Sequence, residues 1–253
     1  MTTTRVFPDA DALGRALAAE ILADLDRAGG RYLLGCPGGR SLMPTYRAVA
    51  AALAERPRDL SGLVIVMMDD YLAGPGRRVG IDRAHSCERF GREHIATPWS
   101  DAVAPLPGVA EVWLPDPADP AAYDERIAAA GGVDLFLLAS GVSDGHVAFN
   151  PPGCDRADRT RVIDLAETTR RDNLATFPHL RTLDAVPRQG VSVGPATIVE
   201  LSRRVRLVAT GAAKAHTVRR TRAASGWQAD WPATLVHECR DPQLWVDEAA
   251  AQG

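Results

Sequence analysis

Lysine is almost absent from this sequence, because Lys214 is the only one among 29 basic residues in a chain of 253. The bias toward arginine weakens any argument from a single arginine and singles out Lys214. A net charge of −3 gives no sign of a nucleic-acid surface. No apolar run approaches the ~20 residues that cross a bilayer, and residues 1–6 lack a signal-peptide core. We therefore expect a cytoplasmic protein without nucleic-acid or membrane partners.

Cysteine is also scarce, and no Cys-x-x-Cys pair is present. The four cysteines are far apart, which argues against a zinc site or a redox pair. We expect them to be reduced and mostly structural: Cys36, Cys87, Cys154 and Cys239. The Gly-Lys-Ser/Thr signature of a nucleotide-binding P-loop is missing as well.

The remaining pattern alternates short apolar runs with segments of helical periodicity, which predicts βαβ units and a mostly parallel sheet in one domain, residues 1–253. Residues 96–120 carry six of the 18 prolines and predict only a short strand at 111–114. Other strands are expected at 31–36, 63–68, 133–139, 161–165, 191–194, 205–210 and 244–247. Helices are expected at 9–28, 43–55, 86–94, 123–130, 168–177 and 212–222.

The most informative segment follows the buried strand 133–139, where the chain turns polar and delivers Asp144 and His146. Ligands of open α/β sheets bind beyond the carboxyl ends of the strands. A carboxylate and an imidazole held by Gly141 and Gly145 can act as an acid–base pair facing one cleft. The alternative is a surface turn in which Asp144 caps the next segment.

Two other strand ends carry candidate site residues. After strand 31–36, Gly38 and Gly39 can turn backbone N–H groups toward an anion, with Arg40 and Ser41 beside them at a helix start. A plain helix-entry turn is the alternative. After strand 63–68 stand the adjacent acids Asp69 and Asp70, and burial or mutual repulsion would raise the pKa of one of them toward that of a general base. The alternative is one capping acid and one solvated acid.

Lys214 is expected in the first turn of helix 212–222, close to the end of strand 205–210. A cation there can face a bound anion, although a solvated helix lysine is the ordinary case. Four strand ends thus offer residues suited to a small anionic substrate.

Taken together, five segments resemble, in order, the glucosamine-6-phosphate deaminase/6-phosphogluconolactonase superfamily. They are residues 34–41, the Met-Asp-Asp-Tyr at 68–71, the Gly-Val-Ser-Asp-Gly-His-Val-Ala-Phe-Asn at 141–150, residues 186–194 and residues 208–215. Residues 245–250 match a common family terminus. The Asp-Asp-Tyr and Ala-Phe-Asn parts are similar to the deaminase branch rather than the lactonase branch.

This resemblance implies a Rossmann-like three-layer αβα sandwich, like the glucosamine-6-phosphate deaminase/ribose-5-phosphate isomerase fold, without metal or nucleotide cofactor. The residue matching Asp69 would move a proton between C1 and C2 of an open-chain sugar. The residue matching His146 would open the pyranose ring, with Asp144 tuning it. The residues expected to bind the substrate and its phosphate are Gly38, Gly39, Arg40, Ser41, Asp70, Asn150 and Lys214.

Two positions depart from the deaminase pattern. The family's Phe-Asn-Glu-Pro reads Phe-Asn-Pro-Pro here, so that Pro151 replaces a glutamate that completes a triad with the histidine. A phosphate-binding arginine aligns with Ala175, and Arg40 or Arg171 would have to compensate.

Three hypotheses follow for the function. The leading one is an aldose–ketose isomerase/deaminase acting on an amino-sugar or related hexose 6-phosphate. The alternative is a sugar-lactone hydrolase similar to 6-phosphogluconolactonase, in which His146 activates water. The third is a non-catalytic sugar-phosphate sensor. A homo-oligomer is possible in each case.

Overall fold

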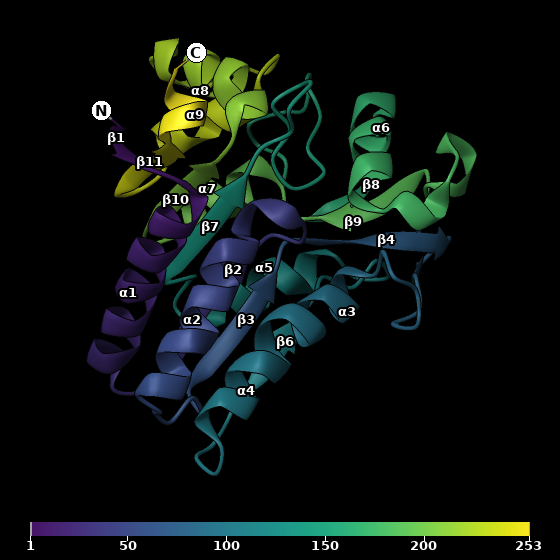
Figure 1. The fold of residues 1–253 in the computed structure, drawn as a ribbon. Coiled ribbons are helices and arrows are strands. Elements are labelled where there is room, and N and C mark those ends of the chain that lie inside the picture. Colours follow the sequence, from purple (N-terminus) through teal and green to yellow (C-terminus); the bar gives the residue numbers. More distant parts are fainter. Residues whose placement is uncertain (1, 253) are drawn as a thin grey trace.

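The computed structural model describes residues 2–252, except for the side chains of Ala175 and Pro178. Its centre is a parallel seven-stranded sheet with the strand order β1-β11-β10-β7-β2-β3-β6 (Figure 1). The strands are β1 (Thr3–Phe7), β2 (Tyr32–Cys36), β3 (Leu63–Met67), β6 (Glu111–Trp113), β7 (Leu135–Ala139), β10 (Val205–Ala209) and β11 (Pro242–Asp247). The predicted parallel sheet is confirmed.

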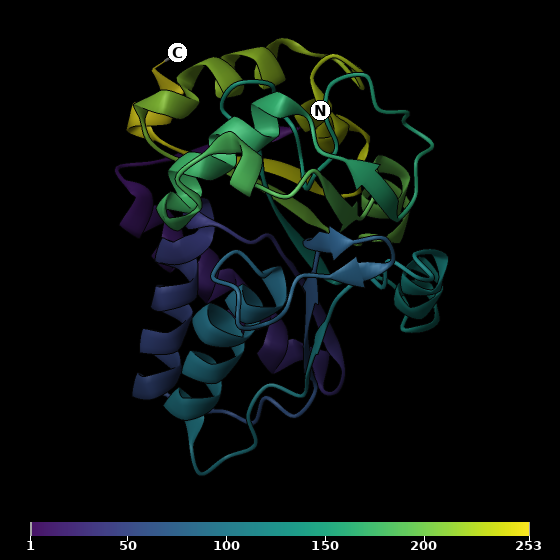
Figure 2. The same cartoon turned by 90° about the vertical axis from the view of Figure 1, so that its right-hand side faces the viewer.

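Helices cover both faces of this sheet, because the central strands are apolar on both sides. Leu34 and Ile65 pack in one core cluster and their neighbours Leu33 and Val64 in the other. The first cluster joins α1 (Ala10–Ala28), α2 (Met43–Glu55) and α4 (Thr97–Val103) to the sheet. The second joins α5 (Ala121–Ala129), α7 (Pro195–Leu201), α8 (Ala215–Ala223) and α9 (Glu248–Ala251). The result is the predicted three-layer αβα sandwich (Figure 2).

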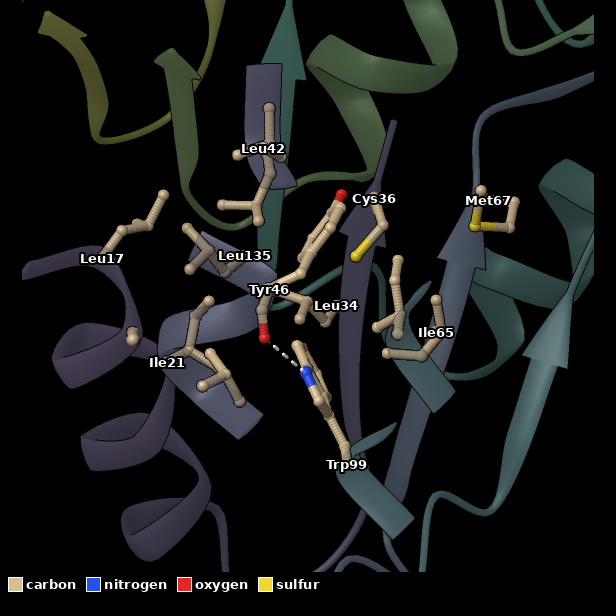
Figure 3. Packing of buried hydrophobic residues seen from close by; sticks show 14 of the residues in the cluster. Leu17, Ile21, Leu34, Cys36, Leu42, Tyr46, Ile65, Met67, Trp99 and Leu135 are labelled. Atoms are coloured by element: carbon tan, nitrogen blue, oxygen red, sulfur yellow. Dashed lines mark hydrogen bonds between the residues drawn. The ribbon is translucent and has the colours of Figure 1, made fainter. Parts of the chain in front are cut away.

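The first helical layer illustrates how local sequence sets these elements. Asp9 caps α1 by accepting a hydrogen bond from the backbone N–H of Ala12 at 2.7 Å, and Gly29 ends the helix in the left-handed region at φ 59°. Figure 3 shows the apolar interior between α1, α2 and the strands. There the indole of Trp99 donates to the carbonyl of Tyr46 at 3.0 Å.

A second, antiparallel sheet lies beside the first, with the order β5-β4-β9-β8. The sequence pattern predicted two of its strands, at 161–165 and 191–194, but not a separate sheet. Its strands are β4 (Asp69–Gly74), β5 (Arg77–Arg78), β8 (Arg161–Asp164) and β9 (Gln189–Ser192). Figure 1 shows β4, β8 and β9 together with α6 (Glu167–Thr176) at one side of the parallel sheet.

Several boundaries differ from the predicted ones. Asp69 begins β4 instead of a loop, and the expected helix 86–94 is α3 (Cys87–Gly91) continued by the π-helical η2 (Arg92–Ala96) and α4. The proline content hid α4, which contains Pro98 in its first turn. The prediction also missed β1 and α7. The remaining short helices are η1 (Arg40–Leu42), η3 (Pro178–Leu180), η4 (Leu183–Ala185), η5 (Ala212–Lys214) and η6 (Pro232–Glu238).

The strand order reverses between β2 and β7, which are neighbours in the sheet. From β2 the chain proceeds outward through β3 to β6, and from β7 it proceeds the other way through β10 to β11. Such a switch point opens a crevice at the carboxyl ends of the strands. As to membranes, none of the helices that the structure describes has the length and apolar character that a crossing needs.

Candidate active site

A cavity of about 260 Å³ lies at this switch point. It receives residues from the carboxyl ends of four neighbouring strands: 37–41 after β2, Asp69 after β3, 139–142 after β7 and Lys214 after β10. The sequence placed candidate residues at these same four ends, and the parallel sheet brings the ends together. The cavity volume suits a small molecule rather than a polymer.

Asp69 is 7% exposed and faces the cavity from the start of β4. Burial raises the pKa of its carboxyl to about 7. A hydrogen bond from the Cys87 thiol, at 3.2 Å, and the charge of His146 oppose this rise, while the charge of Asp70 adds to it. A carboxyl group with such a pKa exchanges protons readily near neutral pH, which suits a general base.

His146 faces the same cavity from the loop after β7, and its ring is held by Asp144. The imidazole Nδ1 lies 2.7 Å from Asp144 Oδ1, and the Thr168 hydroxyl donates to Asp144 Oδ2. Burial alone would raise the pKa of Asp144, but the bonds and charge from His146 and Thr168 outweigh it and hold this pKa well below its usual range. Because Asp144 stays ionised, Nδ1 carries the proton and Nε2 is the atom free to exchange one.

Gly141 makes room for this imidazole. A Cβ atom at position 141 would lie 2.2 Å from His146 Nδ1, closer than any real contact allows. The imidazole can therefore occupy its position beside Asp144 only because residue 141 has no side chain.

The opposite end of the cavity is suited to an anion. Gly38, Gly39, Arg40 and Ser41 line it, with Gly39 at φ 104°, a conformation that favours glycine. Lys214 lines it too, and its ammonium donates to the carbonyl of Ser140. Burial lowers the pKa of Lys214, while the charges of Asp172 and Asp144 counteract that lowering.

The loop that carries Lys214 is anchored from β11. Both carboxylate oxygens of Asp247 accept the backbone N–H of Gly211 at 2.9 Å. Asp247 also caps α9 through the N–H of Ala250. Residues 245–250, which match the family terminus, therefore support the loop that brings Lys214 to the cavity.

Two predicted substrate-binding residues lie outside the cavity-lining set of the described chain. Asp70 is fully buried, and its Oδ1 accepts the backbone N–H groups of Tyr71 and Cys87, both at 2.9 Å. Asn150 donates to the carbonyls of Val147 and Val193 at 3.0 and 2.8 Å. Asp70 Oδ1 and the Asn150 amide thus bind backbone groups of neighbouring loops, and Asn150 Oδ1 accepts from the Arg161 guanidinium at 2.8 Å.

Arg171 also lies away from the cavity, because it is exposed on α6 and pairs with Glu167. Of the two arginines expected to compensate for the missing one, only Arg40 lines the cavity. The side chain of Ala175, the third residue in that comparison, is outside the described residues.

Sequence reasoning missed a set of cavity residues that come from α3, α6, the second sheet and the loop after β7. Ser86 caps α3, accepting from the N–H of Arg89 at 3.3 Å, and this capping signal could have placed Cys87 at a helix start. The other missed lining residues include Tyr71, Phe90, Phe149, Asp172, Asn173 and Phe177. The aromatic members form an apolar wall, since the rings of Tyr71 and Phe149 are 4.9 Å apart.

Among the described residues, one group could offer a metal ion three ligands, namely Asp144, His146 and Asp172, whose ligand atoms all lie within 4.8 Å of one another. Both oxygens of Asp144 already accept hydrogen bonds from neighbours. The group is a cluster of one imidazole and two carboxylates.

Fold and site together define a class of protein: a doubly wound α/β chain with an acid–base pair and an anion cradle at its switch point. The chain belongs to the family described as glucosamine-6-phosphate isomerases/6-phosphogluconolactonase, whose profile matches residues 8–245. Membership implies a phosphorylated sugar as substrate.

Relatives and solved structures agree with this assignment. The glucosamine-6-phosphate deaminase of Arthrobacter sp. (strain FB24) is 37% identical over 220 residues, 85% of this chain and 78% of the relative. That of Streptomyces coelicolor is 33% identical, with coverage of 97% and 90%. A monomeric glucosamine-6-phosphate deaminase superposes with a TM-score of 0.84 at 24% identity, covering 99% of both chains. The 6-phosphogluconolactonase from Trypanosoma brucei gives 0.69 at 20% identity, covering 100% and 98%.

Proposed function

We propose that this protein converts glucosamine 6-phosphate and water into fructose 6-phosphate and ammonia. The observation that carries the proposal is the convergence of Asp69, His146 and the 38–41/Lys214 anion cradle on one cavity. The names of the relatives, at 31–37% identity over most of the chain, support the same reaction.

Ring opening is the first step. Nε2 of His146 takes the proton of the O1 hydroxyl and returns it to the ring oxygen, so that the C1–O5 bond breaks and an aldehyde forms. This requires an imidazole that carries its resting proton on Nδ1, as the ionised Asp144 ensures. The shuttle begins and ends with the same protonation state.

Isomerisation and loss of nitrogen follow. The Asp69 carboxylate removes the C2 proton, the C–H electron pair forms a C1=C2 double bond, and the π pair of the C1=O bond moves to O1. O1 takes a proton from the C2 ammonium group, which gives an enolamine. The proton is returned to C1, which leaves a protonated imine at C2. Water then adds to C2 and ammonia departs, giving the ketose. A base with a pKa of about 7 is well matched to this proton transfer at neutral pH.

The anion cradle fixes the substrate while these protons move. Backbone N–H groups of Gly38 and Gly39, the Ser41 hydroxyl and the cations of Arg40 and Lys214 would hold the 6-phosphate. Interaction energy from the distant phosphate then serves to orient C1 and C2 between Asp69 and His146.

The test is release of ammonia and fructose 6-phosphate from glucosamine 6-phosphate. We expect turnover by the wild type, its loss in His146→Ala, and its retention in His216→Ala, which alters an exposed histidine outside the cavity. In D₂O, Asp69→Asn should no longer exchange the C2 proton. Equal turnover by wild type and His146→Ala would refute the assignment.

The lactonase alternative is supported by one observation: the His146–Asp144 pair by itself could activate water, and Pro151 leaves the deaminase pattern incomplete. It predicts hydrolysis of 6-phosphogluconolactone that survives Asp69→Asn. Assaying both substrates with both variants separates the two functions.

A further inference from the structure

The loop after His146 brings no carboxylate to the cavity where the deaminase pattern has a glutamate. Pro151 occupies that position and is not among the described residues that line the cavity. An imidazole that shuttles a proton becomes a cation for part of the cycle, and a nearby second carboxylate stabilises that cation. Within the described residues, the ring of His146 is hydrogen-bonded to the Asp144 carboxylate and interacts by charge with Asp69.

Asp172 brings such a carboxylate from a different element, the helix α6. One of its oxygens lies within 4.8 Å of a ring nitrogen of His146 and of a carboxylate oxygen of Asp144. Its side chain lines the cavity together with His146 and Lys214. Asp172, His146 and Lys214 thus come from α6 and from two loops that lie far apart in the sequence.

The two oxygens of Asp172 have different surroundings. Oδ1 accepts a hydrogen bond from the Ser143 hydroxyl at 2.8 Å, which ties α6 to the loop of the Asp-Gly-His motif. Oδ2 is shielded from solvent and has no hydrogen-bond partner among the described residues. A buried carboxylate oxygen left unpaired is costly, and such atoms call for a functional explanation.

We propose that Asp172 is a positioning residue for His146, supplying from α6 the carboxylate that Pro151 has removed from the loop. Ser143 orients its Oδ1, which leaves Oδ2 to stabilise the imidazolium that forms while O1 gives up its proton. The inference rests on the proposed function for its kinetic part, but its electrostatic part concerns the resting protein alone.

The electrostatic part is tested by NMR titration of the histidine rings, with the His146 signal assigned from its absence in His146→Ala. Asp172→Asn keeps the shape and the bond from Ser143 but removes the charge. We expect the midpoint of the His146 titration curve to move to lower pH in Asp172→Asn, because the charge beside the ring is lost, and to stay near the wild-type midpoint in Asp172→Glu. Asp184→Asn, at a carboxylate exposed on η4, is the control. A His146 titration in Asp172→Asn that coincides with the wild type overturns the inference.

The kinetic part separates positioning from binding. We expect Asp172→Asn to lower kcat by roughly 10- to 100-fold with little change in KM, and Asp172→Glu to recover much of the loss. A change confined to KM would overturn the positioning role. If the wild type does not turn over glucosamine 6-phosphate, the proposed function fails, and the titration still decides the inference.

Discussion

Asp69 and Cys87 form a pair in which a thiol adjusts a buried carboxyl group. Burial raises the pKa of the Asp69 carboxyl, and the hydrogen bond from the Cys87 thiol lowers this pKa by stabilising the carboxylate. The thiol itself stays protonated, because burial and the neighbouring carboxylates raise the pKa of Cys87 well above its ordinary value. Cys87 can therefore act as a permanent donor.

Removing this donor should move the pH profile of the enzyme. In Cys87→Ala the pKa of Asp69 rises further, so that the acidic limb of kcat/KM moves to higher pH and activity at neutral pH falls several-fold. The pH dependence of kcat/KM measures this. Cys154→Ala, at another buried cysteine away from the cavity, should leave the limb in place. An unshifted limb in Cys87→Ala would show that the thiol has no influence on the base.

The space at Gly141 gives a second prediction for a single residue. In Gly141→Ala the new Cβ displaces the His146 ring from Asp144, and we expect kcat to fall by roughly 100-fold, the usual contribution of a positioned acid–base group. Gly30→Ala is the matched control, because a Cβ there meets nothing within 4 Å. Full activity in Gly141→Ala would mean that the ring does not need its present position.

Among the elements, the β10–η5 loop depends on a residue from a neighbouring strand. Asp247 both caps α9 and anchors Gly211, three residues before Lys214. We expect Asp247→Ala to raise KM for the sugar phosphate by tenfold or more, since Lys214 loses its position, and to cost about 1 kcal/mol in stability for the lost cap.

The control for this prediction is another helix cap. Asp9→Ala removes the cap of α1, far from the cavity, and should cost similar stability without a change in KM. KM values for both variants, with their unfolding midpoints, distinguish anchoring from general destabilisation. Equal KM values would leave Asp247 with the capping role alone.

The sequence could predict the elements that carry their own local signals. The buried runs of β2, β3, β7 and β10 and the apolar spacing of α1 and α2 were identified within a few residues of their ends. Two strands of the second sheet, β8 and β9, were expected at 161–165 and 191–194, whereas β4 was not. The sheet itself could not be predicted, because pairs such as Asp70 with Val191 join residues far apart in the sequence, which local pattern does not reveal. Helix α6 was expected at 168–177, but its contact with the loop of His146 is a tertiary contact, so the place of Asp172 at the cavity could not be predicted from local pattern.

At the scale of the whole molecule, the parallel sheet converts four distant strand ends into one site. Candidate residues at those ends could be predicted because parallel strands present their carboxyl ends to one edge. The roles of Asp70 and Asn150 could not, since a polar side chain beside a site can as well satisfy backbone groups as face a ligand. Spacing alone does not distinguish these outcomes.

The site should also shape how global stability depends on pH. Burial raises the pKa of Asp69 to about 7 and that of Asp70 to about 6, both above the ordinary value of 3.8. Between the ordinary pKa of 3.8 and these raised values, the folded state binds more protons than the unfolded state. The free energy of unfolding is therefore greatest below this pH range and falls as the pH rises through it. Asp144 acts in the opposite sense, but only in strong acid, because its pKa is depressed.

We therefore expect the urea midpoint of the wild type to decline from about pH 4 to about pH 7. Asp69→Asn should flatten this decline and be the more stable protein at the alkaline end, although it has lost its activity. Each tenfold difference in proton affinity corresponds to about 1.4 kcal/mol, so the gain is large enough to resolve. Asp184→Asn, at an exposed carboxylate, should follow the wild-type curve. Parallel curves for wild type and Asp69→Asn would show that Asp69 is already charged at no cost, and would remove the physical basis for its role as a base poised near neutral pH.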